Sequence, residues 1–255
     1  LLTRSSGLVL VTGPTGSGKT TSLYAALNHL NSIEKNIVTI EDPVEYQLDI
    51  INQNEVRAGI DLSFAKMLKH ILRQDPDIVM IGEIRDRETA EIAVQAALTG
   101  HLVLSTVHTN SAVAAIARLR DMGVEPFLLS STITALVAQR LVRRLCDNCK
   151  QPYKPTLSES AELGVKAGVT FYKPVGCMQC QNIGYQGRLG LYEMAVNDDR
   201  LRQMIHDGAS ETDMAAYAFQ TRKTLLQSGA DAVLSGATSS EEVLRVCSAQ
   251  TSDNI

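Results

Sequence analysis

This sequence of 255 residues lacks four features, and each absence argues against a class of protein. Lysine and arginine (24) do not exceed aspartate and glutamate (28), so the net charge is −4, and aromatic residues make up only 4%. A protein that coats nucleic acid normally has a basic surface and aromatic side chains for base stacking. Apolar stretches such as Leu8–Val11 fall far short of the ~18 residues of a membrane span. No charged-then-apolar signal segment opens the chain, so we expect a cytoplasmic protein without a transmembrane segment.

Cysteine is also scarce, and its odd count of five argues against a disulfide framework. Two Cys-x-x-Cys pairs, Cys146 with Cys149 and Cys177 with Cys180, supply four thiolates for a tetrahedral site. Because four thiolates leave no open position for water, we expect a structural Zn²⁺ site in preference to an iron–sulfur cluster. A redox role would explain only one of the two pairs. We expect the fifth cysteine, Cys247, to be buried in an apolar helical stretch.

The first part of the chain alternates short β-type runs with helical patterns, which predicts an α/β fold with a mostly parallel sheet covered on both faces. The expected strands are residues 8–12, 36–40, 77–81 and 102–107. The expected helices are residues 20–30, 64–72, 89–98, 112–122 and a longer one at 126–145.

Two further regions follow. Four of the five cysteines and several Gly-containing turns indicate a small loop-rich module, and the pattern after it is helical. We therefore expect three parts: a nucleotide-binding core over residues 1–145, a four-cysteine metal-binding module over 146–192 and a helical subdomain over 193–255.

Residues 13–20, GPTGSGKT, fit the pattern G-x-x-x-x-G-K-[ST], with an apolar strand before them and a helical run after them. Glycines let the loop curl so that its N–H groups point at phosphate, and the helix N-terminus adds its positive end. Lys19 would reach the β- and γ-phosphates, and the Thr20 hydroxyl would bind Mg²⁺. The residues expected to hold the nucleotide are Gly13, Pro14, Thr15, Gly16, Ser17, Gly18, Lys19, Thr20 and Thr21.

The run at 78–81 ends in Gly82-Glu83, where Glu83, on a strand expected next to the P-loop strand, can orient an attacking water. The Asp that often precedes such a Glu is missing, and the acidic cluster Glu41, Asp42 and Glu45 is the natural replacement as a partner for Mg²⁺. A further strand, flanked by two histidines, ends in a polar cluster containing His108, which we interpret as a sensor of the γ-phosphate.

The order GPTGSGKT (13–20), TIEDPVEY (39–46), DPDIVMIGEIRD (75–86) and TGHLVLSTVHTN (99–110) resembles the Walker A, Asp box, Walker B and His box of the secretion and pilus-assembly ATPases. The cysteines and the stretch at 184–193 are similar to the metal-containing branch, the type II secretion and type IV pilus extension ATPases. The resemblance covers residues 5–247, and the run at 201–214 favours type II secretion. The retraction and type IV secretion ATPases of the same superfamily lack the four cysteines.

The resemblance implies a RecA-like P-loop core that hydrolyses ATP with Mg²⁺ and drives pseudopilus assembly and protein export. It implies Lys19, Glu83, His108 and Glu45 as catalytic groups. It also implies a hexamer in the full-length protein, docked through platform and cytoplasmic-domain partners at the cytoplasmic face of the inner membrane. Family members carry N-terminal domains that contribute arginines to a neighbour's site, so this sequence is expected to be the C-terminal ATPase half.

Two other classes remain as alternatives. A P-loop kinase with a zinc lid would need an arginine-rich lid and no water-orienting Glu, which Glu83 argues against. A nucleic-acid translocase would need the basic and aromatic surface that the composition does not supply. We therefore expect no direct contact with nucleic acid.

Overall fold

The computed structural model describes residues 2–56 and 63–247, which form two compact units. The first unit consists of the chain up to Thr15, Lys19–Ala138 and Met194–Thr221. The second consists of Gly16–Gly18, Gln139–Glu193 and the chain from Arg222 onward. Within the described residues, no helix combines the length and the hydropathy needed to cross a membrane.

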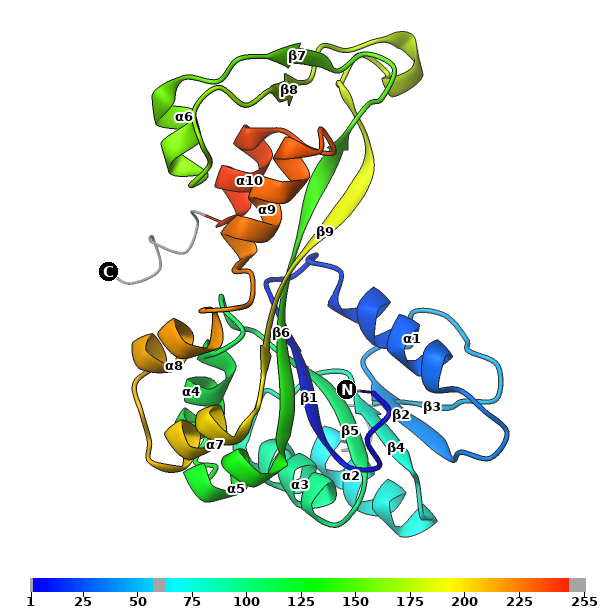
Figure 1. Ribbon diagram of the computed structural model, residues 1–255. Helices are drawn as coiled ribbons and strands as arrows, with labels where there is room; N and C mark the ends of the chain where they lie inside the picture. Colours follow the sequence, from blue (N-terminus) through cyan, green and yellow to red (C-terminus); the bar gives the residue numbers. More distant parts are fainter. Residues whose placement is uncertain (1, 57–62, 248–255) are drawn as a thin grey trace. The chain divides into compact units, whose positions relative to one another are not determined.

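The first unit is built on a sheet whose strands are ordered β3-β2-β4-β5-β1-β6-β9 (Figure 1). The strand pairs from β3 to β6 are parallel. The strands are β1 Gly7–Thr12, β2 Ile37–Glu41, β3 Asn52–Glu55, β4 Ile78–Ile81, β5 Leu102–Val107, β6 Ile133–Leu145 and β9 Tyr185–Val196. Strands β6 and β9 continue into the second unit.

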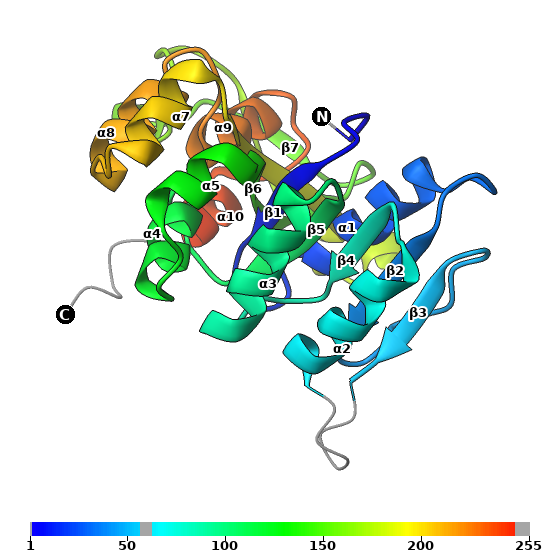
Figure 2. The same cartoon turned by 90° about the horizontal axis from the view of Figure 1, so that it is seen from below.

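Helices cover both faces of this parallel sheet, with α1 on one face and α2 and α3 on the other (Figure 2). One buried cluster joins Val9 and Met80 of the strands to Leu23 and Leu27 of α1. The helices of this unit are α1 Lys19–Leu30, α2 Phe64–Ile71, α3 Arg87–Leu98, α4 Ala114–Asp121, α5 Pro126–Thr132, α7 Asp199–His206 and α8 Glu211–Ala218.

The second unit holds a two-stranded antiparallel sheet and two packed helices. Its own elements are β7 Gln151–Tyr153, α6 Leu157–Glu162, β8 Phe171–Lys173, the 3-10 turn Met178–Cys180, α9 Leu225–Leu234 and α10 Ser240–Cys247. Helices α9 and α10 approach so closely that a Cβ on Gly229 would lie 2.3 Å from Val243 Cγ1. Cys247 is buried, as expected, and the residues after it lie outside the described residues.

The prediction of one long helix over residues 126–145 is wrong. Helix α5 ends at Thr132, and the chain then enters the thirteen-residue strand β6, whose Leu136 pairs with Leu10 of β1. Nearly every residue from Ile133 to Ala138 is buried, so the strand shows no alternation of apolar and polar residues. An apolar run of this kind cannot be distinguished from a buried helix by periodicity alone.

The strand that carries the Gly-Glu pair is also placed differently from the expectation. It was expected beside the P-loop strand, but β5 lies between β4 and β1. The carboxyl ends of β1, β4 and β5 nevertheless meet at one edge of the sheet, because parallel strands end on the same side.

Candidate functional site: a phosphate-binding loop and a four-thiolate cluster

The loop between β1 and α1 curls as phosphate-binding loops do. Gly13, Gly16 and Gly18 have φ angles of 148°, 77° and 86°, which residues with a side chain adopt with strain. The Lys19 side chain turns back over the loop, and its Nζ donates to the carbonyl oxygens of Gly13 at 2.8 Å and Pro14 at 3.0 Å. The sequence therefore folds locally as the motif predicts.

The residues of this loop fit a polyphosphate. The Ser17 hydroxyl is buried and has no hydrogen-bond partner among the residues that the structure describes, which is costly unless a ligand supplies one. The first turn of α1 has no acidic residue that would repel an anion. No acidic side chain of its own first turn therefore neutralises the positive end of the α1 dipole, which favours an anion there.

Glu83 lies directly after β4, and its backbone neighbours are fixed to both adjacent strands. Gly82 N donates to Ile40 O at 2.8 Å, and the Thr106 hydroxyl donates to Gly82 O at 2.7 Å. The Glu83 side chain is 12% exposed and forms an ion pair with Arg85. Its other carboxylate oxygen lies 3.5 Å from His108 Nε2.

His108 follows β5, and its pKa is affected by burial and by the charges of Lys19 in the loop and of Glu83. Burial lowers the pKa of His108, the charges of Lys19 and Arg85 lower it further, and Glu83 opposes them. These influences together favour the neutral imidazole. The second histidine near this strand, His101, lies at its opposite end and contacts Ala96 O at 2.9 Å, so it does not join the site.

The acidic cluster after β2 separates into one buried and two exposed carboxylates. Glu41 is 3% exposed and accepts hydrogen bonds from Tyr24, Thr39 and Gln53. Asp42 and Glu45 are exposed. The carboxylates free to approach a Mg²⁺ ion are therefore Asp42 and Glu45, and this oxygen donor set is the kind that Mg²⁺ prefers.

Sequence reasoning missed Arg85, Tyr24 and Gln53. Arg85 lies within the recognised motif, where its charge was the available signal. Tyr24 lies in the helix expected at residues 20–30, where no feature of the sequence set it apart. Gln53 lies on β3, a strand with no apolar run to indicate it.

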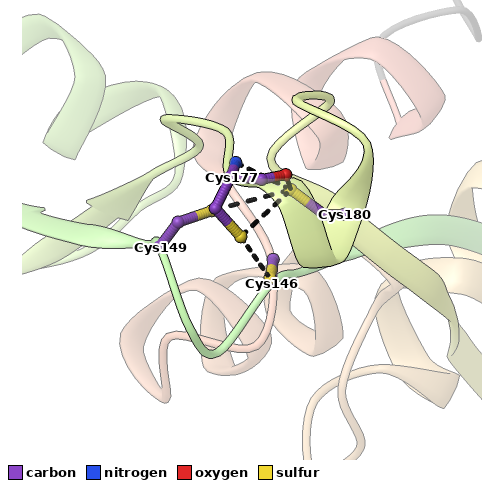
Figure 3. A group of neighbouring side chains, drawn as sticks. All are labelled: Cys146, Cys149, Cys177 and Cys180. Carbon is purple, nitrogen blue, oxygen red and sulfur yellow. Dashed lines mark hydrogen bonds between the residues drawn. The ribbon is translucent and has the colours of Figure 1, made fainter.

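The four cysteines of the second unit converge as their spacing predicts (Figure 3). Their sulfur atoms all lie within 4.8 Å of one another. The Sγ–Sγ distances are 3.9 Å for Cys146–Cys177, 3.8 Å for Cys149–Cys180 and 3.7 Å for Cys177–Cys180. Four sulfurs placed tetrahedrally at about 2.3 Å from Zn²⁺ lie about 3.8 Å apart, whereas a disulfide needs about 2.05 Å. The set fits a tetrahedral metal ion.

Donor groups surround the cluster, although burial raises the pKa of the Cys149 thiol to about 11. The amide of Gly176 donates to the Cys149 sulfur at 3.3 Å, and the amide of Gly184 donates to the Cys180 sulfur at 3.2 Å. The Asn148 side chain donates to Cys177 and, with backbone amides, lowers the pKa of that thiol to about 6. Such outer contacts orient metal ligands and stabilise their charged form.

A loop of the G-x-x-x-x-G-K-[ST] pattern between a parallel strand and a helix, with a carboxylate at the same sheet edge, is the arrangement of a P-loop nucleotide-binding protein. Within that class, the chain belongs to the family described as "Type II/IV secretion system protein", which matches residues 1–245. The resemblance found in the four motifs is thereby confirmed.

Relatives in several bacteria share most of this sequence. The chain is 55% identical to type II secretion system protein E of Dickeya dadantii, covering 96% of this chain and 49% of the relative. It is 52% identical to type II secretion system ATPase E of Vibrio cholerae, with coverage of 96% and 49%. The chain thus spans about half the length of the curated relatives it matches.

A solved structure supports the fold. The pilus retraction motor PilT with bound ADP is 31% identical, superposes with a TM-score of 0.73, and is matched over 96% of this chain and 62% of that chain. The α/β fold with a mostly parallel sheet and C-terminal helices is therefore confirmed.

Proposed function

We propose that this chain is the ATP-hydrolysing part of a type II secretion motor. Identities of 52–57% to type II secretion proteins E, against 31% to the pilus retraction motor, support the type II assignment. Type IV pilus extension is the alternative. In the proposed setting the full-length protein forms a hexamer, and platform and cytoplasmic-domain proteins hold it at the cytoplasmic face of the inner membrane.

The observation that supports the hydrolase assignment is the position of Glu83, whose carboxylate lies 3.5 Å from His108 Nε2 at the sheet edge where β1 leads into the loop of Lys19. Lys19, now bonded to loop carbonyls, neutralises phosphate charge. Glu83 accepts a hydrogen bond from the attacking water and orients it. Neutral His108 donates a hydrogen bond near the terminal phosphate.

Two further groups are proposed for the metals. Thr20 at the start of α1 and Glu45 on the acidic loop would hold Mg²⁺, which neutralises charge on the nucleotide. The four cysteines would hold a structural Zn²⁺ that stabilises the loop-rich part of the second unit.

The test uses Glu83→Gln and Lys19→Ala, with Glu88→Gln as a control because that exposed carboxylate pairs with Lys69. We expect Glu83→Gln to retain ATP binding and to lose about 10²–10⁴-fold in phosphate release. Lys19→Ala should lose nucleotide binding, and Glu88→Gln should match the wild type. Full turnover in Glu83→Gln would refute the role of Glu83, and phosphate transfer to a nucleotide acceptor would indicate a kinase.

A further inference from the structure

A buried polar hub connects the helix of the phosphate-binding loop to the acidic loop, residues 42–45. Its centre is Tyr24 of α1, whose side chain is 0% exposed and donates to the Glu41 carboxylate. The same hydroxyl oxygen accepts from Glu45 N at 3.2 Å and Gln53 Nε2 at 3.3 Å. We call Tyr24, Thr39, Glu41 and Gln53 the hub.

Gln53 fixes the other side of the loop. Its Nε2 donates to Glu41 Oε1 at 3.1 Å and to Tyr46 O at 3.1 Å, while its Oε1 accepts from Leu48 N at 2.6 Å. One side chain therefore fixes backbone groups on both sides of residue 47. The backbone N–H of Glu45 therefore donates to Tyr24, and the backbone just after Glu45 is held by Gln53.

The Glu41 carboxylate accepts hydrogen bonds from the three other residues of the hub. Thr39 Oγ1 donates to it at 2.5 Å, so donors from three elements converge on its carboxylate. Burial and the contact with Glu41 raise the pKa of Tyr24, which keeps the hydroxyl protonated and donating. Glu41 thus holds Tyr24 and Gln53 in place.

Tyr24 also lies one helical turn after Thr20. Residues i and i+4 share a face of an α-helix, so the hub lies on the same side of α1 as the Thr20 hydroxyl. The Glu45 amide is anchored to that same face.

We propose that Tyr24 and Gln53 are positioning residues of the magnesium site, which hold the acidic loop so that Glu45 faces the Thr20 end of α1. The inference rests on the proposed function, and it adds the two residues that hold the acidic loop in place beside the magnesium site. Neither side chain touches the metal. Loss of such outer contacts typically weakens metal affinity by about 10–100-fold.

The test measures magnesium and nucleotide separately. A fluorescent ATP analogue is titrated in excess EDTA and then at increasing Mg²⁺, and the Mg²⁺ dependence of phosphate release is recorded beside it. For Tyr24→Phe and Gln53→Ala we expect at least a roughly tenfold higher Mg²⁺ concentration at half-saturation. The affinity for the analogue in EDTA should remain at the wild-type value.

Tyr217→Phe is the matched control, because it removes a tyrosine hydroxyl that donates to a carboxylate, Asp198 Oδ1, at 3.1 Å. It should leave the Mg²⁺ dependence unchanged. Thermal unfolding of each variant separates loss of the fold from loss of positioning. If Tyr24→Phe does not fold, Gln53→Ala serves as the test, because its side chain is only half-buried on the edge strand β3.

An unchanged Mg²⁺ dependence in a folded hub variant would overturn the inference and leave the proposed function standing. Failure of both variants to fold would also overturn it, since the hub would then serve folding alone. If Lys19→Ala binds the analogue as tightly as the wild type does, the proposed function itself falls.

Discussion

Glu242 allows a stability prediction whose size follows from its contacts. Its side chain is 1% exposed in α10 and accepts from Arg143 N at 2.9 Å, from the Arg143 guanidinium at 2.7 Å and from Arg245 at 3.1 Å. Burial alone would raise the pKa of Glu242, but these hydrogen bonds lower it from 4.5 to about 2. Glu242→Gln removes the charge and keeps the shape.

The lowered pKa translates into free energy of unfolding. At about 1.4 kcal/mol per pH unit, the drop from 4.5 to about 2 corresponds to roughly 3 kcal/mol. Because the folded-state pKa is depressed, this stabilisation is fully present above pH 4.5 and is lost as the pH falls from 4.5 towards 2. Arg143 is half-exposed, so water solvates its freed guanidinium and adds little to the loss.

The assay is unfolding of the wild type, Glu242→Gln and the control Glu241→Gln, whose side chain is exposed on the same helix. At pH 7 we expect Glu242→Gln to lose about 3 kcal/mol, or roughly 5–10 °C in Tm, and Glu241→Gln to lose almost nothing. The gap between wild type and Glu242→Gln should narrow below pH 4.5. A gap under about 1 kcal/mol at pH 7, or one that does not change with pH, would refute the reasoning.

Two further predictions concern the site residues. Cys177→Ser should lower the zinc content and the thermal stability, since it removes one of the four sulfur ligands. The control Cys247→Ser should keep the metal, because that thiol lies outside the cluster. Equal zinc contents of the two variants in elemental analysis would contradict this prediction. The His108 imidazole should titrate below pH 6.5 by NMR because of burial and the nearby Lys19, and Lys19→Ala should raise its pKa. A His108 pKa that is insensitive to Lys19 would show that the two groups are not coupled.

Much of the fold could be predicted because several of its strands are continuous apolar runs in the sequence. β1 and β5 are buried at every position, and such apolar runs between helical patterns predict parallel strands. The phosphate-binding loop and the cysteine pairs were likewise predictable, since each is a local motif whose geometry follows from a few adjacent residues. A tight turn holds the two sulfurs of each pair together, and the antiparallel pairing of β7 with β8 brings the two pairs together.

Strand β6 shows where local reading fails. Its second half contains Leu141, Arg143 and Arg144, which are strong helix formers, yet its backbone forms a strand. Residues Ile133–Ala138 bind to the edge of β1 in parallel register and are nearly all buried, and the strand then continues through residues 141–144 despite their helix preference. The β-branched Ile133, Thr134 and Val137 were the signal that favoured a strand.

The hub could not be predicted from any single segment of the sequence, because the pairing of β2 with β3 brings its residues together. Thr39 and Glu41 are two residues apart on β2 and point to the same face, and Gln53 pairs directly opposite Thr39. A slip of one residue in that pairing would turn Gln53 to the other face and remove its hydrogen bonds with Glu41, Tyr46 and Leu48. β3 has no apolar pattern, so these polar contacts favour the register in which its backbone pairs with β2. Gln53, proposed to position the acidic loop, therefore also helps to hold the strand that carries it.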